Sequence, residues 1–485
     1  MPSLSRKAGF AGAAIAFASL YLAAGAPTPM LVELQDKWGF GDDALTVAFA
    51  AYAFALVAAM LIVGSLSDYI GRRPVLVAFM ALELIAMVMF LLAGDVGWVT
   101  AARAVQGFAT GAATSAFTAE IVELSPPERP ALGGVIGSTA PAGGLALGAL
   151  LTGAAVQLAA NPRSLTFVVL TGVMAAGTAL ACFLPDTTPR RRGALRSLRP
   201  HLSVPRAAAA EFIAAIPAQV AAWMLAGLFL GLVPTVMREV FHHDSGLLNG
   251  ATAFVEPATA AVAILFLGRR TPREATRLGC WAIASGTLVI VVGISAQLLA
   301  LIWIGGVVGG VGFGGALSGG IRTLAPLVDA KDRAGLFAAL YLVAYLAFGL
   351  PSVIAGQLAA HSVSVRAIAT AYGITVVVAA LLGSIAQARQ SRAQVSRESR
   401  VPAGTARPGS RPRAPHAREP DRRAAGSACR GGLRRRPAQP CRRSSPWRRR
   451  RRARTPRAPR PLESVVGWPP RASRRARSRG LPMAR

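Results

Sequence analysis

The sequence predicts an all-α membrane protein with twelve transmembrane helices in two six-helix bundles, followed by a disordered, arginine-rich tail. Three observations carry this prediction. Only 41 of residues 1–386 are charged, about 11%, whereas a soluble domain carries roughly 25%. Long apolar stretches recur between short polar breaks, and successive loops are alternately rich and poor in Lys and Arg. This composition excludes a soluble enzyme. Four cysteines without paired spacing exclude a disulfide scaffold and a zinc ribbon.

Twelve apolar segments are each long enough to cross the roughly 30 Å of hydrocarbon in a bilayer, at about 1.5 Å per helical residue. In order they are 8–30, 44–66, 74–94, 98–120, 131–157, 164–184, 207–235, 247–267, 278–297, 299–320, 334–360 and 366–386. The ninth and tenth are separated only by Ser295-Ala296-Gln297. The first could also be a signal peptide, because Arg6-Lys7 precedes its apolar run. Pro27 directly after the small residues Ala24-Gly25-Ala26 argues against cleavage, so we expect this segment to be the first helix.

The Lys and Arg residues of the loops predict the orientation. Eighteen lie in the amino-terminal segment and in the loops on the same side. The loops of the other side carry only Lys37, Arg163, Arg238 and Arg366. Because cytoplasmic loops carry an excess of Lys and Arg, we expect a multi-pass protein of the plasma (inner) membrane with both termini in the cytoplasm.

The longest loop divides the helices into two sets of six. It contains six arginines and predicts an N-terminal bundle at 1–184, a basic cytoplasmic linker at 185–206 and a C-terminal bundle at 207–386. Two bundles joined in this way are expected of a transporter built from repeats, with a cavity between them near the middle of the bilayer.

The tail at 387–485 carries 30 Arg, no Lys and four acidic residues. It has few aliphatic residues to form a core, so we expect it to be disordered. Its run Trp447-Arg-Arg-Arg-Arg-Arg452 would suit anionic lipid headgroups, or nucleic acid without sequence preference. The composition also fits GC-rich coding sequence read in a wrong frame, and these alternatives stay open. We expect no specific nucleic-acid partner.

The most informative motif joins the second and third predicted helices and reads Gly64-Ser-Leu-Ser-Asp-Tyr-Ile-Gly-Arg-Arg-Pro-Val-Leu76. Its candidate site residues are Gly64, Asp68, Gly71, Arg72 and Arg73. Glycine permits close helix approach and tight turns, and the arginines hold the turn on the cytoplasmic side. The motif resembles the signature loop of the major facilitator superfamily, G-x-L-[SA]-D-x-x-G-R-R-x-x-L. The resemblance implies a membrane transporter that works by alternating access, with this loop acting as a cytoplasmic gate.

A second segment, Arg103-Ala-Val-Gln-Gly107, matches the R-x-x-Q-G segment of the same family. An arginine at a helix centre costs about 2.5–3.5 kcal/mol on insertion scales, so Arg103 should face a wet cavity or a carboxylate. Gln106 and Thr110 follow on the same helical face. The resemblance implies that this face lines the central cavity and that Arg103 takes part in proton coupling. The alternative is an arginine that snorkels and only anchors the helix end.

Two carboxylates lie in the middle of predicted spans. Glu256, followed by Pro257, is a candidate proton carrier that would work with Arg103. It could instead be a protonated acid bonded to a neighbouring helix. Glu83 lies on the third helix, which in similar proteins packs at the periphery, and we assign it no role.

Two glycine patterns in predicted spans resemble known motifs only in part. Proton-coupled exporters of the family often carry G-x-x-x-G-P-x-x-G-G in helix 5. This chain has Gly137-Ser-Thr-Ala-Pro-Ala-Gly-Gly144, with alanine before the proline and the glycine pair one residue early. Gly310-Val-Gly-Phe-Gly-Gly315 satisfies a nucleotide-binding pattern, but it lies inside an apolar span rather than between a strand and a helix. We expect it to serve helix packing.

The sequence therefore favours a proton-coupled exporter of a small organic molecule. An uptake symporter or facilitator for a metabolite is the first alternative, and a membrane sensor or scaffold is the second. We expect a monomer in the lipid bilayer whose partners are its substrate and protons. We expect no cofactor, no metal site and no chemical conversion of the substrate.

Overall fold

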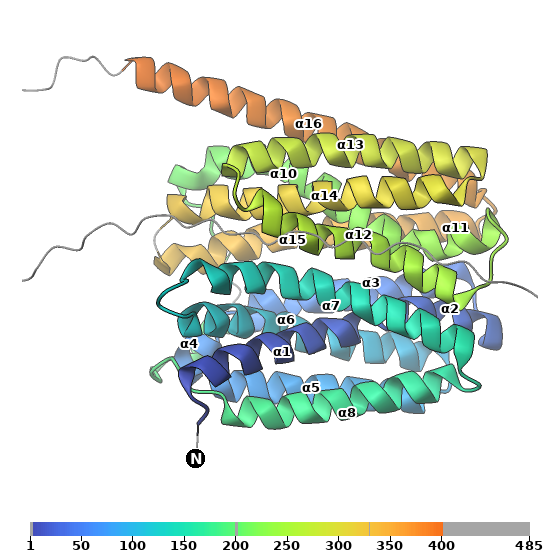
Figure 1. The fold of residues 1–485 in the computed structure, drawn as a ribbon, viewed down its shortest axis with the longest axis horizontal. Helices are drawn as coiled ribbons and strands as arrows, with labels where there is room; N and C mark the ends of the chain where they lie inside the picture. Colours follow the sequence, from blue (N-terminus) through green and yellow to red (C-terminus); the bar gives the residue numbers. More distant parts are fainter. Residues whose placement is uncertain (1–2, 199–201, 329, 401–485) are drawn as a thin grey trace, which may run out of the picture. The chain divides into compact units, whose positions relative to one another are not determined.

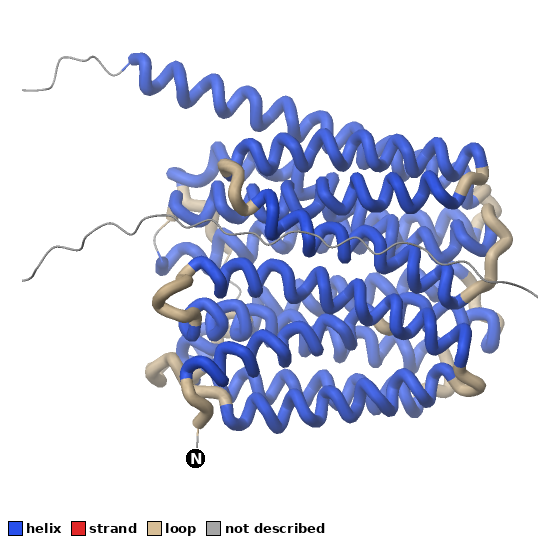
Figure 2. Tube along the Cα trace, viewed as in Figure 1, coloured by secondary structure: helices blue, strands red, loops and turns tan. Residues whose placement is uncertain are grey.

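A computed structural model describes residues 3–198, 202–328 and 330–400. Within these ranges every regular element is a helix, and the long helices run side by side (Figures 1 and 2). The predicted all-α fold is confirmed. Most of the predicted tail, residues 401–485 with the Trp447 run, lies outside the described residues.

The first half of the chain forms eight helices. They are α1 (Arg6–Gly25), α2 (Pro27–Trp38), α3 (Asp42–Val63), α4 (Ser67–Ile70), α5 (Arg72–Leu92), α6 (Val96–Leu124), α7 (Ala131–Leu158) and α8 (Pro162–Phe183). Helix α2 continues the direction of α1, and α4 is a single turn inside the signature loop. These eight helices therefore make six spans.

The second half follows the short helix α9 (Ala194–Ser197) of the linker. Its elements are α10 (Arg206–Gly227), a π turn (Leu228–Leu232), α11 (Val233–Glu239), α12 (Gly246–Leu267), α13 (Pro272–Ala296), α14 (Leu299–Leu324), a 3-10 turn (Ala325–Leu327), α15 (Ala330–Ala360) and α16 (Val365–Arg400). Over the described part of the chain, eleven helical segments are long and apolar enough to cross a membrane. The less apolar α6, with 29 residues, makes the twelfth.

Two predicted helices are interrupted where proline residues lie. The first, expected at 8–30, breaks at Ala26 and continues as α2 to Trp38. The seventh, expected at 207–235, passes through the π turn just before Pro234 and ends at Glu239. Proline has no backbone N–H to donate and its ring clashes with the preceding turn, so the helix must change its hydrogen-bond pattern there.

The last helix is longer than predicted. We expected it to end at 386, but α16 continues to Arg400 through residues that we assigned to the disordered tail. This extension contains no proline or glycine, and the first proline after it is Pro402. A chain of Gln, Ala, Arg and Ser residues can continue an existing helix because no new helix has to be nucleated.

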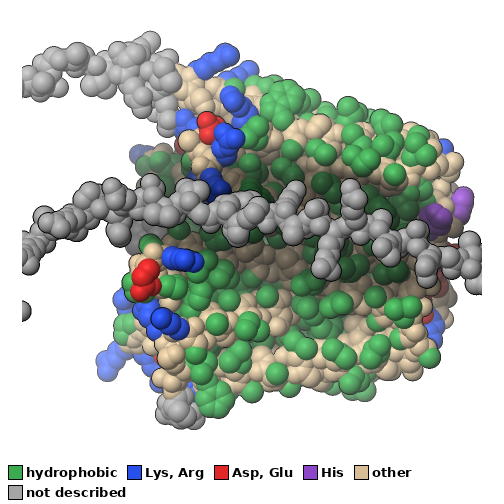
Figure 3. Space-filling view, in the orientation of Figure 1, with side chains coloured by type: hydrophobic (Ala, Val, Ile, Leu, Met, Phe, Trp, Pro, Cys, Tyr) green, Lys and Arg blue, Asp and Glu red, His purple; other side chains and the backbone are tan. Residues whose placement is uncertain are grey.

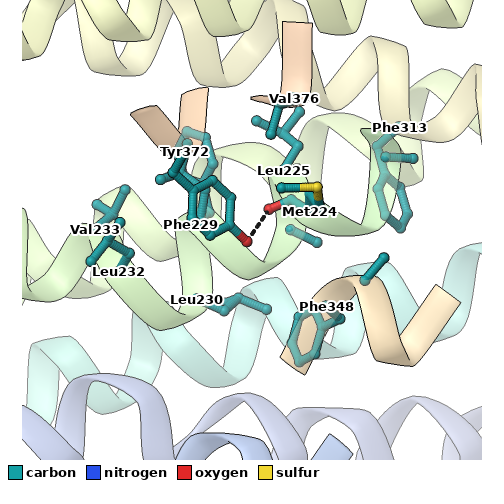
Figure 4. Packing of buried hydrophobic residues seen from close by; sticks show 14 of the residues in the cluster. Met224, Leu225, Phe229, Leu230, Leu232, Val233, Phe313, Phe348, Tyr372 and Val376 are labelled. Carbon is teal, nitrogen blue, oxygen red and sulfur yellow. Dashed lines mark hydrogen bonds between the residues drawn. The ribbon is translucent and has the colours of Figure 1, made fainter. Parts of the chain in front are cut away.

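Two six-helix bundles lie beside each other, α1–α8 in one and α10–α16 in the other (Figure 1). Across the boundary α7 packs against α12, and α3 packs against α15. A buried hydrophobic cluster surrounds the π turn of the second bundle (Figure 4). There the Tyr372 hydroxyl donates a hydrogen bond of 2.9 Å to the carbonyl oxygen of Met224. This bond ties α16 to α10.

The outer surface is that of a membrane protein. Large apolar side chains such as Ile213 and Phe266 are 66% and 64% exposed, and hydrophobic side chains cover the flank of the molecule between its two ends (Figure 3). Lys and Arg gather at the end where α1 begins (Figure 3). We call this end the basic face and the other end the opposite face. An apolar flank between polar ends is stable only in lipid, so the chain is a multi-pass membrane protein.

The glycines of α14 serve close packing against α13. A Cβ atom at Gly312 would lie 2.6 Å from the backbone nitrogen of Ile283, and one at Gly286 would lie 2.5 Å from the backbone nitrogen of Gly309. Small residues let membrane helices approach in this way. The glycine pattern of α14 is thus a packing feature.

Candidate functional site

The signature loop forms a sharp turn at the basic face. Helix α3 ends at Val63 and is capped by Gly64, α4 makes one turn, and Gly71 then adopts φ +101° before α5 begins. A Cβ atom at Gly71 would lie 2.6 Å from a carboxylate oxygen of Asp186. Both the positive φ and the close carboxylate require glycine at this position.

Arg72 is the centre of this turn, and its side chain is only 10% exposed. One guanidinium nitrogen, Nη1, lies 2.5 Å from Asp68 Oδ1 and 2.6 Å from the Ser67 hydroxyl. The other, Nη2, lies 3.1 Å from Glu123 Oε1 on α6. The backbone N–H of Arg72 donates to Asp186 Oδ1 at 3.0 Å. Arg72 therefore joins α4, α5, α6 and the linker.

Further contacts attach the amino-terminal segment and the linker to α6. Arg6 Nη2 donates to the carbonyl oxygens of Glu123, at 2.5 Å, and Ser125, at 3.1 Å. The Thr187 hydroxyl donates to Glu120 Oε2 at 2.8 Å, and also to Glu123. Arg73 is half-buried at the start of α5. The sequence predicted the loop but not its partners, which come from α6 and from the segment after α8.

Arg103 lies inside the N-terminal bundle and is only 2% exposed, so it does not reach the surface as an anchoring residue would. Its Nη1 donates to Gln106 Oε1 at 2.7 Å and to the carbonyl oxygen of Ala24 at 3.4 Å. The guanidinium carbon lies 4.3 Å from the centre of the Tyr52 ring. Such stacking of a cation on an aromatic ring partly replaces lost hydration.

Glu83, to which we assigned no role from its sequence position, completes this cluster. It is fully buried on α5. Gln106 Nε2 donates to Glu83 Oε1 at 3.1 Å, and the Thr110 hydroxyl lies 3.3 Å from Glu83 Oε2. The predicted cavity residues Arg103, Gln106 and Thr110 are thus brought together around a carboxyl group of the neighbouring helix.

A signal for Glu83 was present in the sequence. Helices α5 and α6 are joined by only three residues, 93–95, so they must be antiparallel neighbours. In such a hairpin, residues at equal distances from the turn lie at the same depth, and Glu83 is at the level of Arg103 and Gln106. Opposite charges at one depth in a membrane are expected to find each other.

Glu256 is 1% exposed on α12 of the other bundle. Its Oε1 has no hydrogen-bond partner among the residues that the structure describes. It shares no hydrogen bond with Arg103, whose guanidinium contacts are with Gln106, Ala24 and Tyr52. The structure therefore does not pair the two residues that we expected to work together.

Aromatic and phenolic side chains meet at the boundary between the bundles. The Tyr21 hydroxyl of α1 lies 3.0 Å from the Thr114 hydroxyl of α6, and it interacts with the hydroxyl of Tyr345 on α15. The Tyr345 ring lies 4.5 Å from the ring of Trp223. The indole N–H of Trp223 has no partner within the described ranges. Nothing in the sequence had singled out these residues.

Arg238 links the two bundles at the opposite face. From the end of α11, Nη2 lies 2.9 Å from Asp42 Oδ1 at the start of α3, and Nη1 donates to Gln35 Oε1 on α2 at 2.7 Å. Asp36 lies 3.4 Å from the same Nη1. Gln35 Nε2 in turn donates to Asp42 at 2.8 Å. Several charges in one network hold more firmly than an isolated surface ion pair.

Helices α7 and α12 approach each other most closely towards the same face. A Cβ atom at Gly153 would lie 2.6 Å from the Cα of Gly250 and 2.6 Å from the carbonyl oxygen of Gly246. Nearby, the Ser245 hydroxyl lies 2.9 Å from Gln157 Oε1. The two bundles are thus in direct backbone contact across these glycines.

Comparisons with known proteins agree with this architecture. The family model described as Major Facilitator Superfamily matches residues 13–278, more than half of the chain. No curated protein sequence matches. Among solved structures, the chain is similar to the crystal structure of the human organic anion transporter MFSD10 (TETRAN), with a TM-score of 0.55 and 18% identity. That likeness covers 79% of this chain and 100% of the other, and at this identity it shows the fold alone. The family match, the twelve helical spans and the signature loop lead to one conclusion: the chain belongs to the major facilitator superfamily.

Proposed function

We propose that this protein is a secondary active transporter that exports a small organic molecule in exchange for protons. It works as a monomer in the plasma (inner) membrane, with the basic face and both termini in the cytoplasm. The observation that carries this proposal is the set of side chains at the boundary between the bundles. Phenol and indole groups of both bundles meet there at mid-depth, next to the buried charges of the N-terminal bundle. Such groups suit an organic substrate with apolar and polar parts.

Two separate sets of contacts support alternating access. At the opposite face the Arg238 network and the Gly153 contact join the bundles. At the basic face Arg72 joins the signature loop to α6 and the linker. Rocking of one bundle against the other would break the contacts at the opposite face and open the protein on that side. The Arg72 contacts would control access from the basic face. In this proposal Gly64, Asp68, Gly71, Arg72 and Arg73 form the cytoplasmic gate.

Proton coupling is assigned to the buried polar groups. Arg103, Gln106 and Thr110 line the proton-coupling region of the N-terminal bundle, and Glu256 is a second carboxyl group in the C-terminal bundle. The buried cation Arg103 also suits a substrate that carries negative charge. The similarity to an organic anion transporter makes organic anions the first compounds to test.

Transport into inside-out membrane vesicles tests this function. A panel of labelled organic anions and drug-like compounds is offered to vesicles with and without the protein, under proton gradients of either direction. An exporter that exchanges substrate for protons should accumulate a compound when the vesicle lumen is acidic. Accumulation only with an alkaline lumen would indicate a symporter. Entry that depends on the protein but reaches only equal concentrations would indicate a facilitator, and no protein-dependent entry of any compound would favour a sensor or scaffold.

The orientation makes its own prediction. A reporter enzyme that is active only in the cytoplasm should work when it is fused near Arg196 or Arg273, and should be inactive near Asp42 or His242. The reason is that Arg196 lies in the linker and Arg273 near the start of α13, on the side where α1 begins, whereas Asp42 starts α3 and His242 follows α11 on the other side. Reporter activity near Asp42, or its loss near Arg273, would contradict the proposed orientation.

A further inference from the structure

The carboxyl group of Glu83 is buried in an unusual way. Each of its two oxygens has a polar partner. Gln106 Nε2 is 3.1 Å from Oε1, and the Thr110 hydroxyl is 3.3 Å from Oε2. Yet no Lys, Arg or His nitrogen lies within 4.0 Å of this carboxyl group among the ion pairs of the described residues, although Arg103 is on the next helix. The Thr110 hydroxyl donates to the carbonyl oxygen of Gln106 at 2.9 Å, so its oxygen is free to accept from a protonated Glu83. A buried acid with neutral hydrogen-bond partners, close to a cation but not paired with it, needs a physical reason.

Gln106 lies between the cation and the acid. Its amide oxygen accepts from Arg103 at 2.7 Å, while its amide nitrogen donates to Glu83 at 3.1 Å and to the carbonyl oxygen of Ala23 at 3.0 Å. The amide therefore separates the guanidinium from the carboxyl group. Arg103 Nε has no partner within the described part of the chain, so the guanidinium keeps a donor free. A small movement of either side chain would let the arginine bind the carboxylate directly.

The charge state of Glu83 decides which arrangement is stable. An ionised carboxylate at this depth is costly unless a cation pairs with it directly. A protonated acid has no such need, and neutral donors and acceptors suffice. The arrangement with the intervening amide fits the protonated acid, and a direct ion pair would fit the ionised one.

We propose that Glu83 is the proton-binding site of the N-terminal bundle. In a conformation that admits water to this site, the acid releases its proton to that water, and the resulting carboxylate draws the Arg103 guanidinium away from Gln106. Proton binding reverses the change. This inference rests on the proton coupling in the proposed function, and it moves the carrier from Glu256 to Glu83.

Few other titratable groups face Glu83. On α6 there is Arg103, and on α3 there is Tyr52, which interacts with both Arg103 and Glu83. Helix α8, which also packs on α5, carries only Arg163 and Cys182, one near each end. On α5 itself the other charged residues are Arg72 and Arg73, at the basic face. Tyr21, the tyrosine of α1, interacts with Tyr52 rather than with the acid.

The position of Tyr52 explains how the charge state of Glu83 would affect the boundary between the bundles. The Arg103 guanidinium lies over the Tyr52 ring, and α3, which carries Tyr52, packs against α15 of the other bundle. Three residues before Tyr52, the ring of Phe49 lies 4.9 Å from that of Phe348 on α15. A guanidinium that leaves the Tyr52 ring removes a contact from the helix that meets the second bundle. The two charge states thus favour different bundle arrangements.

The experiment uses the full-length protein in lipid nanodiscs and needs no substrate. The native cysteines are replaced by serine; they are Cys182, Cys280, Cys429 and Cys441. Spin labels are placed at the exposed positions Glu128 and Arg269, one on each bundle at the basic face. Distances between the labels are measured in acidic and in alkaline buffer. The variants are Glu83→Gln, Glu83→Asp and, to test the competing carboxyl group of the other bundle, Glu256→Gln.

We expect the distance distribution of the parent protein to change with pH. Glu83→Gln, which mimics the protonated acid, should keep the acidic distribution at every pH. Glu83→Asp should restore a pH-dependent change, and Glu256→Gln should retain the parent's response. Infrared difference spectra between the two buffers should contain a carboxylic-acid carbonyl band that Glu83→Gln lacks, and a merely structural residue would not remove that band.

Two results would overturn the inference, and they are distinguishable. If Glu83→Gln keeps the pH response and the carbonyl band while Glu256→Gln loses both, the proton carrier is Glu256 and the proposed function stands. If the parent protein itself shows neither a pH response nor a carbonyl band, proton coupling fails as a whole, and the role of Glu83 fails with it.

Discussion

Gly153→Leu should abolish transport while leaving both bundles folded. The position faces backbone atoms of α12, where even a Cβ atom would lie 2.6 Å from the Cα of Gly250. A leucine there must push α7 and α12 apart at the opposite face. Overpacking of this kind costs about 1–3 kcal/mol, and about 1.4 kcal/mol already changes an equilibrium tenfold. The conformation closed at the opposite face should therefore become rare, and alternating access would stop.

Spin labels at Leu158 and Asp244 would measure this effect directly. Both residues are exposed and lie at the opposite face, one on each bundle. In the parent protein we expect a large population at short distance, as in the structure, and in Gly153→Leu a shift to longer distance. Gly134→Leu is the matched control on the same helix, because a Cβ atom at Gly134 meets nothing within 4 Å. An unchanged distribution in Gly153→Leu would show that this contact does not limit opening.

Arg72→Ala should leave the protein inserted in the membrane but reduce turnover severely. Arg72 makes charge-assisted hydrogen bonds to Asp68 and Glu123 from a side chain that is only 10% exposed. Each such bond contributes about 1.5–3 kcal/mol, so its loss at the gate should slow transport by about tenfold or more. Without the guanidinium, the two carboxylates would also repel each other.

The measurement is transport of a compound identified by the vesicle panel, normalised to the amount of protein in the membrane. Arg72→Lys should recover only part of the activity, because an ammonium group cannot bind Asp68 and Glu123 with the fork geometry of a guanidinium. Arg192→Ala removes an exposed arginine from the linker at the same face and should transport normally. Normal turnover by Arg72→Ala would reduce the signature loop to a marker of topology.

The arginine-rich loops and the spans were predictable from the sequence for a simple reason. A helix that crosses hydrocarbon must be apolar along about 20 residues, so each span is visible without knowledge of its neighbours. The eighth helix, for example, was expected at 247–267 and runs from Gly246 to Leu267. Breaks inside spans were missed because hydropathy does not change there. Pro27 lies between Ala26 and the apolar residues Met30-Leu31-Val32, and Pro234 lies between Val233 and Val236-Met237, so the residues next to each break are still apolar.

The signature loop and the Arg103 face were also predicted, because motif spacing fixes which residues share a turn or a helical face. Their partners were not. Arg72 meets Glu123, 51 residues away, and Arg238 meets Asp42, 196 residues away. Residue spacing within one helix says nothing of such pairs. The contact of Glu83 with Gln106 could have been predicted only from the short α5–α6 hairpin, which places both residues at the same depth.

The amino-acid sequence is enough to show that the chain crosses the membrane twelve times, that its basic loops lie on one side and that a polar helix face carries Arg103. Each of these follows from the cost of placing charged and polar groups in hydrocarbon, which acts on every segment separately. Packing between helices sets the rest: Gln106 links Arg103 to Glu83 and not to Glu256, and Arg238 and Gly153 join the bundles at the opposite face. These contacts join different helices, so they depend on how the helices pack and on which small residues allow close approach.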